Sequence, residues 1–378
     1  MKTILDSPTK KFIKVKYGKC KIGSNRYEGW YRYGGFTSYI RNLVGKNMPI
    51  DTGKITYEDG GSYEGEWRFG LKNGFGKEVT GENTCYEGHW KNDKKSGHGL
   101  FTNKNGDLYM GNWNNGCRDG VGKEQLVNGD VYEGTYIKGW RDGHFKVHLE
   151  NRGTYEGQFK YNKYDGTGKE TFANGDRFEG EFQNGLRNGI GKLICKDGER
   201  YEGEWERGLK HGYGKQHYLN GSFYEGCWKN GMRKGNGTMK FSDGSYYQGS
   251  WKKDHRDGMG IEGNDPGDTY EGEWRAGKLY GGRGKLNYAN GDCYEGEFVD
   301  GLRQGQGSLT YYGGDLYVGQ WINDMKEGDG CETYVNGKVL EGVWKKGKFW
   351  DGEGWQDMDN GKSWKANWVK GVKDMVLS

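Results

Sequence analysis

The sequence is poor in proline and aliphatic residues, and it has no long apolar run. Only 3 of its 378 residues are proline, and the hydrophobic residues, aromatics included, amount to 32%. Two or three ordinary globular cores need more apolar surface than this. No stretch approaches the roughly 20 apolar residues that cross a bilayer, and residues 1–17 lack the apolar core of a secretion signal. We therefore expect a cytoplasmic protein without a transmembrane segment.

The residues that are abundant suggest two opposite states. The chain holds 73 glycines and 29% charged residues, and its mean hydropathy is −1.08, values typical of disorder. Yet 15% of the residues are aromatic, with 15 Trp and 28 Tyr, and disordered chains contain few aromatics. Seven cysteines, an odd number, are typical of reduced thiols in the cytosol. The spacing of the aromatic residues therefore decides whether the chain is ordered.

The aromatic residues recur with a fixed period, which is the mark of a repeat protein. The phrase YEGEW and its variants return every 23 residues, with one step of 24 between Tyr270 and Tyr294. We number each repeat from its first residue, which we call position zero. These residues are Tyr63, Tyr86, Tyr109, Tyr132, Tyr155, Phe178, Tyr201, Tyr224, Tyr247, Tyr270, Tyr294, Tyr317 and Leu340. Degenerate copies start at Tyr27 and Trp364.

Each repeat predicts one β-hairpin. The segment YEGEW is followed by a loop such as ERGLKH (206–211) and a second segment such as GYGKQHY (212–218). A closing NG, DG or GG pair favours positive φ and a tight turn, and no segment has the spacing of a helix. We therefore predict an all-β fold, an elongated single-layer antiparallel β-meander of about 13–15 tandem hairpins. Residues 63–362 hold thirteen repeats, 1–62 form a basic N-terminal segment, and 363–378 form a degenerate repeat and tail.

Alternation along a strand assigns the side chains to two faces. Position zero, the glycine two residues later and the aromatic residue four residues later share one face. A large ring can lie flat on the backbone only where its neighbour is glycine, so this face replaces a conventional core. The other face carries glutamates such as Glu202 and lysines such as Lys215, which we expect to form weak cross-strand ion pairs.

These motifs and their spacing resemble a known family. YEGEW, the GxG of the second segment and the closing NG, at 23-residue spacing, resemble the MORN (membrane occupation and recognition nexus) repeat over residues 63–362. The resemblance implies consecutive hairpins with an aromatic-lined groove. It also implies a scaffold or adaptor at the cytoskeleton, at cilia or on the cytoplasmic face of a membrane. Some members bind a helix or peptide in the groove, some have been linked to anionic phospholipids, and some carry an attached enzyme, for which this chain has no room.

The groove prediction names specific rings. A partner helix or peptide is expected to contact the aromatic residues at position zero and four residues later in eight repeats. These residues are Tyr63, Trp67, Tyr86, Trp90, Tyr109, Trp113, Tyr201, Trp205, Tyr224, Trp228, Tyr247, Trp251, Tyr270, Trp274, Tyr317 and Trp321.

Motifs that would indicate catalysis or a cofactor do not hold. The recurring Gly-Lys pairs lack the earlier glycine and the following Ser or Thr of a phosphate loop. The cysteines fall at scattered positions of the repeat, and His144 and His148 are about 13 Å apart if they lie on a strand. An open sheet offers no pocket that would separate the environments of two acids. We expect no enzymatic activity, no catalytic residue, no cofactor and no metal.

The N-terminal segment differs from the rest in charge. Residues 1–50 contain eleven basic and two acidic residues, a net charge of +9. A loop insertion of 13 residues follows Tyr27. This insertion can be a plain cap on the first strand. The sharper hypothesis is a contact for an acidic partner, either anionic lipid headgroups or an acidic protein surface, whereas nucleic acid is disfavoured because the rest of the chain is net acidic. The candidate contacts are Lys10, Lys11, Lys14, Lys16, Lys19, Lys21, Arg41 and Lys46.

Three functions remain open. The leading hypothesis is a non-enzymatic scaffold that binds partner segments in its groove. The alternatives are a peripheral membrane protein that binds anionic lipid through its N-terminal segment and an accessory subunit of a separate enzyme. The free edges of an open meander also predict a homo-oligomer through the terminal repeats.

Overall fold

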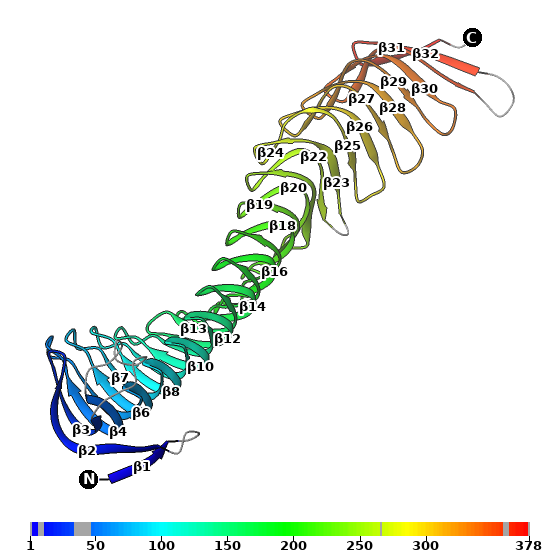
Figure 1. Ribbon diagram of the computed structural model, residues 1–378. Helices are drawn as coiled ribbons and strands as arrows, with labels where there is room; N and C mark the ends of the chain where they lie inside the picture. The colour runs from blue at the N-terminus through cyan, green and yellow to red at the C-terminus, as the bar shows by residue number, and fades with distance from the viewer. Residues whose placement is uncertain (1, 7–10, 34–46, 265–266, 358–362, 377–378) are drawn as a thin grey trace. The chain divides into compact units, whose positions relative to one another are not determined.

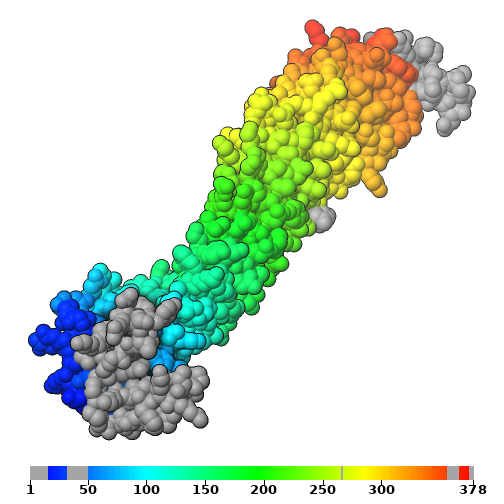
Figure 2. Space-filling view, in the orientation of Figure 1, coloured from blue at the N-terminus to red at the C-terminus, as the bar shows by residue number. Residues whose placement is uncertain are grey.

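The computed structural model describes residues 2–6, 11–33, 47–264, 267–357 and 363–376, and the chain is all-β there (Figure 1). It divides into two compact units, Met1–Asn188 (unit 1) and Gly189–Ser378 (unit 2). The division falls within β16 (Leu186–Ile194). In the space-filling view unit 1 runs from blue to green and unit 2 from green to red (Figure 2). Within the described ranges, no helix is long and apolar enough to cross a membrane.

Unit 1 is an antiparallel meander in which each strand pairs with the next in the chain. Its strands are β1 (Lys2–Asp6), β2 (Lys11–Ile22), β3 (Asn25–Tyr33), β4 (Asn47–Thr56), β5 (Ser62–Arg68), β6 (Leu71–Val79), β7 (Cys85–Lys91), β8 (Lys94–Thr102), β9 (Leu108–Asn114), β10 (Cys117–Gln125), β11 (Val131–Ile137), β12 (Trp140–Leu149), β13 (Gly153–Lys160), β14 (Lys163–Phe172) and β15 (Arg177–Gln183).

Unit 2 continues the same hairpin pattern. Its strands are β17 (Arg200–Glu206), β18 (Leu209–His217), β19 (Phe223–Lys229), β20 (Met232–Lys240), β21 (Ser245–Lys252), β22 (His255–Asn264), β23 (Thr269–Arg275), β24 (Lys278–Leu279), β25 (Gly282–Asn287), β26 (Cys293–Val299), β27 (Leu302–Thr310), β28 (Leu316–Ile322), β29 (Met325–Thr333), β30 (Val339–Lys345), β31 (Lys348–Asp357), β32 (Ser363–Val369) and β33 (Val372–Val376). The predicted β-meander of repeats is confirmed.

The first turn of each hairpin is shorter than the sequence predicts. Between β17 and β18 only Arg207 and Gly208 form the turn, with φ of 51° and 83°. Two consecutive positive φ values are typical of a type I′ turn, whose twist matches that of the strands. The predicted loop 206–211 is therefore wrong, because most of it is the start of β18. A shift of register between Gly203 and Glu204, a β-bulge, absorbs the extra residue.

Hydrogen bonds at this turn connect each repeat to the one before it. The backbone N–H of Gly231 donates to the carbonyl of Lys210, 2.9 Å away. Where the glycine is replaced by Asp254, the Asp254 N–H makes the same bond to Arg233, and its carboxylate also accepts from the Arg233 N–H at 2.9 Å. Glycine and aspartate are thus interchangeable here, because both leave the inter-repeat bond intact.

The single 24-residue step has a local effect. Its additional residue lies at Tyr280–Gly281 and splits the second strand of the hairpin into β24 and β25. The N–H of Tyr280 donates instead to the carbonyl of Glu273 at 2.9 Å. The pairing of Tyr270 with Leu286 then restores the register. The insertion interrupts one strand and leaves the order of the repeats unchanged.

The face opposite the rings, which we call the ion-pair face, carries a ladder of cross-strand ion pairs. Lys192 and Glu202 lie opposite one another with 3.3 Å between Nζ and Oε2, and Lys215 and Glu225 repeat this at 3.1 Å. These side chains are between 40% and 68% exposed, so each pair contributes little stability. Their charges cancel within the face.

Candidate functional site: the aromatic face

The rings of the repeats form the core of the sheet on what we call the aromatic face. Tyr201 lies edge-to-face between Trp205 of its own repeat and Trp228 of the next, with ring centroids 5.2 and 5.4 Å apart. Its hydroxyl donates to the Glu204 carbonyl at 2.9 Å. The indole N–H of Trp228 donates to the carbonyl of Gly214 in the preceding repeat at 3.1 Å. Each repeat therefore completes the core of the repeat before it.

The structure places the predicted groove rings inside this core. All but Tyr270, which is half-buried, are at most 8% exposed. These buried rings are Tyr63, Trp67, Tyr86, Trp90, Tyr109, Trp113, Tyr201, Trp205, Tyr224, Trp228, Tyr247, Trp251, Trp274, Tyr317 and Trp321. Their contact with a partner stays a prediction, and the exposed part of the aromatic face is made by other residues.

Glycine is required beneath each position-zero ring, as the alternation predicts. A Cβ placed on Gly214 would lie 2.6 Å from Cζ of Tyr201, far inside van der Waals contact. On Gly203 it would lie 2.6 Å from the carbonyl oxygen of Tyr213. The ring and the two glycines therefore form one packing unit.

One repeat solves this packing problem in another way. Phe145 stands where the other repeats have the glycine of the second strand, and it is fully buried. Its ring packs against Tyr136 and Phe159, with centroids 5.3 and 4.8 Å apart. Tyr132, at position zero, is only half-buried and lies under the Arg141 guanidinium, 3.5 Å from ring centroid to Cζ. Phe145 has taken the core position that Tyr132 would otherwise fill.

A column of cations covers the buried rings, and the sequence analysis missed it. Nine residues after position zero the chain has Lys or Arg in ten of thirteen repeats. The Nζ of Lys326 lies 4.5 Å from the ring centroids of both Tyr317 and Trp344, a cation–π arrangement. The recurrence of a basic residue at this position was the available signal. It was hidden because the position was assigned to a loop.

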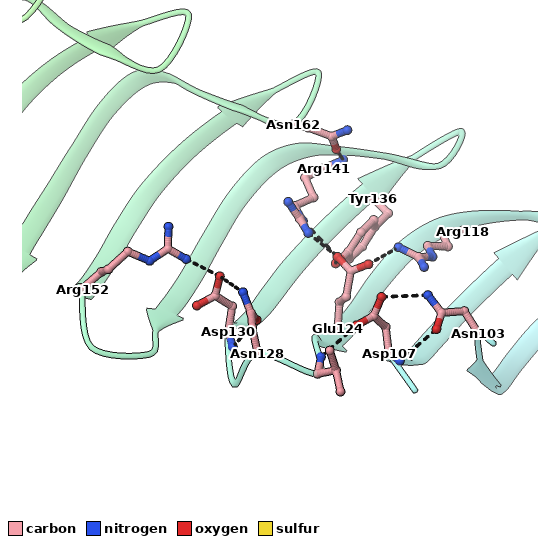
Figure 3. A network of polar contacts seen from close by, with 11 residues as sticks. Asn103, Asp107, Arg118, Glu124, Asn128, Asp130, Tyr136, Arg141, Arg152 and Asn162 are labelled. Atoms are coloured by element: carbon pink, nitrogen blue, oxygen red, sulfur yellow. Dashed lines mark hydrogen bonds and ion pairs between the residues drawn. The ribbon is translucent and has the colours of Figure 1, made fainter. Parts of the chain in front are cut away.

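Most of these cations have a carboxylate partner on the same face. Glu124 is the strongest case, with Arg118 and Arg141 approaching its carboxylate from two sides (Figure 3). The distances are 2.6 Å from Arg118 Nη1 to Oε1 and 2.5 Å from Arg141 Nη2 to Oε2, and Tyr136 Oη lies 3.4 Å from Oε2. Burial alone would raise the pKa of Glu124, but the two guanidinium charges outweigh it and lower the pKa. The carboxylate is therefore held in its charged form.

Lys95 and Lys210 are the exceptions among the described cations, and Lys210 donates to the neutral side chain of Gln216. Lys95 is the clearer case. Its Nζ lies 4.1, 4.9 and 5.0 Å from the ring centroids of Phe101, Trp113 and Tyr86. Phe101 occupies the position where Lys72 has Glu78, and among the described residues no carboxylate lies within ion-pair distance of Lys95. Burial therefore lowers its pKa. The three rings compensate in part for the loss of water around this ammonium group.

The exposed part of the aromatic face in unit 2 contains an apolar hollow of about 390 Å³. Tyr218 and Phe241, both half-buried, form its walls together with Met239. Arg233 and Glu199 place charges of opposite sign at its border. Rings recur at the same position of the later repeats, each half-buried: Tyr288, Tyr311 and Tyr334. The hollow has the composition of a site for a side chain of a partner: an apolar surface with a few polar groups at its border.

The predicted anionic contact lies partly outside the described residues. Lys10, Arg41 and Lys46 fall there, and Lys11 and Lys14 are placed on β2 by the backbone alone. Lys16, Lys19 and Lys21 are exposed on the same strand. Lys19 lies 3.3 Å from Glu28 and repeats the ion-pair ladder. Among the predicted contacts whose side chains are described, Lys16 and Lys21 therefore remain without an ion pair to another described residue.

Solved structures resemble the chain only weakly. The SAS-4 (dCPAP) TCP domain of Drosophila melanogaster, in complex with a proline-rich motif of Ana2 (dSTIL), is 15% identical. That comparison covers 48% of this chain and 86% of that one, with a TM-score of 0.26. The TCP10 domain of Danio rerio CPAP, in complex with a STIL peptide, is 11% identical over 71% and 94%, with a TM-score of 0.21. TM-scores this low carry no argument about function. No curated protein matches the sequence.

A family model, by contrast, matches more than half of the chain. The MORN repeat model matches residues 63–82, 86–108, 109–131, 155–177, 178–200, 201–223, 224–246, 247–269, 270–293, 294–316 and 317–339. The stretch 132–154, which it passes over, is the hairpin where Phe145 replaces the glycine. With eleven matched repeats and the hairpin meander that they build, the chain belongs to the MORN repeat family.

Proposed function

We propose that this chain is a non-enzymatic scaffold that holds a segment of a partner protein on its aromatic face. The hollow at Tyr218 and Phe241 carries the proposal, since it offers exposed apolar surface on a face where nearly all the rings at position zero and four residues later are buried. The partner segment, a helix or an extended peptide, would place an apolar side chain in the hollow and polar groups near Arg233 and Glu199. The cytoskeleton or the cytoplasmic face of a membrane is the proposed place of action, as the family resemblance implies.

Two tyrosines of one hairpin provide a matched test. Tyr218 lines the hollow, whereas Tyr213 is 55% exposed on the ion-pair face, where it donates to Glu225. Affinity purification from cells of the source organism would compare the full-length chain with Tyr218→Ala and Phe241→Ala combined, and with Tyr213→Ala. We expect the first variant to lose the captured protein at least tenfold and the second to retain it. Circular dichroism shows whether both variants remain folded. Equal capture by the folded variants would contradict the proposal.

A second candidate function is contact with anionic lipid through β2. Lys16 and Lys21 favour it, because both are exposed and neither forms an ion pair with a described side chain, and each basic residue at an anionic surface contributes about 1 kcal/mol. Flotation with vesicles of phosphatidylserine, with phosphatidylcholine vesicles as the control, would compare the wild type with Lys16→Glu and Lys21→Glu combined. Equal flotation of both proteins would exclude this contact.

A further inference from the structure

The hairpin turns of unit 1 form two rims of opposite charge. The first rim consists of the turns and adjoining residues 68–71, 91–94, 114–117, 137–140, 160–163 and 183–186. The second rim, at the other ends of the strands, consists of 58–61, 81–84, 104–107, 127–130, 150–153 and 173–176. The first holds six basic residues and one acidic residue, and the second holds seven acidic and two basic residues. Their net charges are therefore +5 and −5.

The cations of the first rim are not neutralised by ion pairs with the part of the chain that the structure describes. Lys91, Lys94 and Lys163 are exposed and form no ion pair with any described residue. On the ion-pair face, by contrast, Lys77 lies 3.1 Å from Glu87, and other lysines there follow the same pattern. The single acid of the first rim, Asp93, accepts a hydrogen bond from the backbone N–H of Lys72 at 2.7 Å. The positive charge of this rim therefore faces solvent.

The second rim keeps its negative charge in the same way. Glu58 and Glu82 are exposed and form no ion pair among the described residues. One of its two basic residues, Arg152, is bound to Asp130 (Figure 3). Asp130 is 3% exposed and also accepts from the Glu150 N–H at 3.0 Å. The arginine compensates for a buried acid and does not neutralise the exposed ones.

Both rims also expose apolar side chains. On the first rim Trp140 and Tyr161 are 50% and 62% exposed and meet edge-to-face, 6.3 Å between ring centroids. Leu71 is exposed on the same rim, and Val127 is 74% exposed on the second. Interfaces between proteins combine such apolar anchors with a charged surround.

The two rims repeat with the same spacing, because they are the two ends of the same strands. Each repeat adds two strands, so the turns of either rim recur about every 10 Å. In Figure 1 the turns of successive hairpins in unit 2 line up in the same way. There the first-rim turns are 206–209, 229–232, 252–255, 275–278, 299–302, 322–325 and 345–348, and the described second-rim residues are 196–199, 219–222, 242–245, 267–268, 289–292, 312–315 and 335–338. By sequence these residues carry +5 and −4.

We propose that copies of this chain associate side by side, with the first rim of one copy against the second rim of the next. Opposite charge, equal spacing and exposed apolar groups on both rims argue for a second copy as the partner. An anionic membrane could bind the first rim, but it would leave the second rim without a role. Because the two surfaces differ, the contact is heterologous and can continue from copy to copy. It is independent of the partner site on the aromatic face and of the terminal strands.

Sedimentation equilibrium of the full-length chain tests the proposal. In low salt we expect the average mass to rise above the monomer's 43.0 kDa with increasing concentration. It should return to that value in about 0.5 M salt, where the screening length falls to a few ångströms. A monomer at every concentration in low salt would overturn the proposal, and so would association that salt leaves unchanged.

Two charge-reversal variants test the two rims one at a time. The first-rim variant carries Lys91→Glu, Lys94→Glu and Lys163→Glu, and the second-rim variant carries Glu58→Lys, Glu82→Lys and Glu150→Lys. Each variant alone should associate much less than the wild type at the same concentration and salt, because one of the two rims of unit 1 is lost while unit 2 keeps both. Mixed in equal amounts, the variants should regain association above the level of either alone, because each retains the unit 1 rim that the other lacks.

Three further results would contradict the rims as the contact. The first is association of either variant alone at the wild-type level. The second is a mixture that associates no more than either variant alone. The third is a wild type that is monomeric in solution and binds phosphatidylserine vesicles, together with loss of this binding in the first-rim variant. Circular dichroism shows whether the variants are folded, and all six substituted residues are exposed, in turns or at the strand ends that adjoin them.

Discussion

At position 145 we expect glycine to give a more stable protein than alanine, the reverse of the usual order in a strand. Phe145→Ala removes a fully buried ring and should lower local stability by about 3–5 kcal/mol. Tyr132 could refill the space only if position 145 has no Cβ. At the equivalent Gly122 a Cβ would lie 2.6 Å from Cζ of the position-zero Tyr109. Phe145→Gly removes this obstacle, although glycine in a strand otherwise costs about 0.5–1 kcal/mol relative to alanine.

We expect Phe145→Gly to be about 2 kcal/mol more stable than Phe145→Ala. Hydrogen exchange of the amides in β11 and β12 would measure this as a roughly 30-fold difference in local opening. Nitration of Tyr132 by tetranitromethane should fall in Phe145→Gly, because the ring moves into the core. Phe159, buried in the same cluster, is the control, since there Gly should be worse than Ala. If Phe145→Gly is no more stable than Phe145→Ala, or Tyr132 stays as reactive as in the wild type, the exchange of rings is refuted.

Gly214→Ala should lower the stability of its hairpin by about 3 kcal/mol through overpacking. Gly313→Ala should leave the melting temperature almost unchanged, because a Cβ at that position meets no atom within 4 Å. Equal losses in the two variants would contradict the packing argument. Glu124→Gln should cost about 3 kcal/mol at pH 7. Because the pKa of Glu124 is lower in the folded than in the unfolded protein, its contribution to stability is complete above the unfolded pKa near 4.5 and is lost as the pH falls through the folded pKa. In urea titrations the stability difference between the wild type and Glu124→Gln should therefore shrink as the pH falls below 4.5. A difference that stays constant would exclude the ionic origin. Lys326→Met should cost about 3–5 kcal/mol of stability, because it leaves the buried Glu332 carboxylate without its cation. Lys95→Met, measured by the same titration, should change stability by no more than about 1 kcal/mol. A large loss of stability in Lys95→Met would show that the rings stabilise the ammonium charge more than burial destabilises it.

The repeat, the strand direction and the two faces could be predicted from the sequence, because each follows from a local rule. Tyr201, Gly203 and Trp205 alternate with Glu202 and Glu204, and this alone assigns them to opposite faces. The ion-pair ladder follows from the same alternation. The family model supports the repeats, and the structure confirms the meander.

The covering of the rings could not be predicted in this way. It depends on a two-residue turn and a β-bulge, which move Lys210 from the expected loop into β18 and over Tyr201. The bulge depends on pairing between strands and leaves no periodic mark in the sequence. The exchange between Tyr132 and Phe145 was missed for a related reason. A glycine replaced by phenylalanine signals a disturbed repeat, but only packing shows which ring occupies the core.

Because a position-zero ring such as Tyr201 is packed partly by the next repeat, the last ordinary repeat of such an array would expose a ring unless something covered it. At the C-terminal end Leu340 takes position zero, and Phe349 and Trp368 pack on its cluster. Those two rings lie 5.2 Å apart, and Trp368 comes from the degenerate last hairpin. That hairpin therefore covers the last complete repeat, and a truncation that removes residues 363–378 should loosen this repeat first.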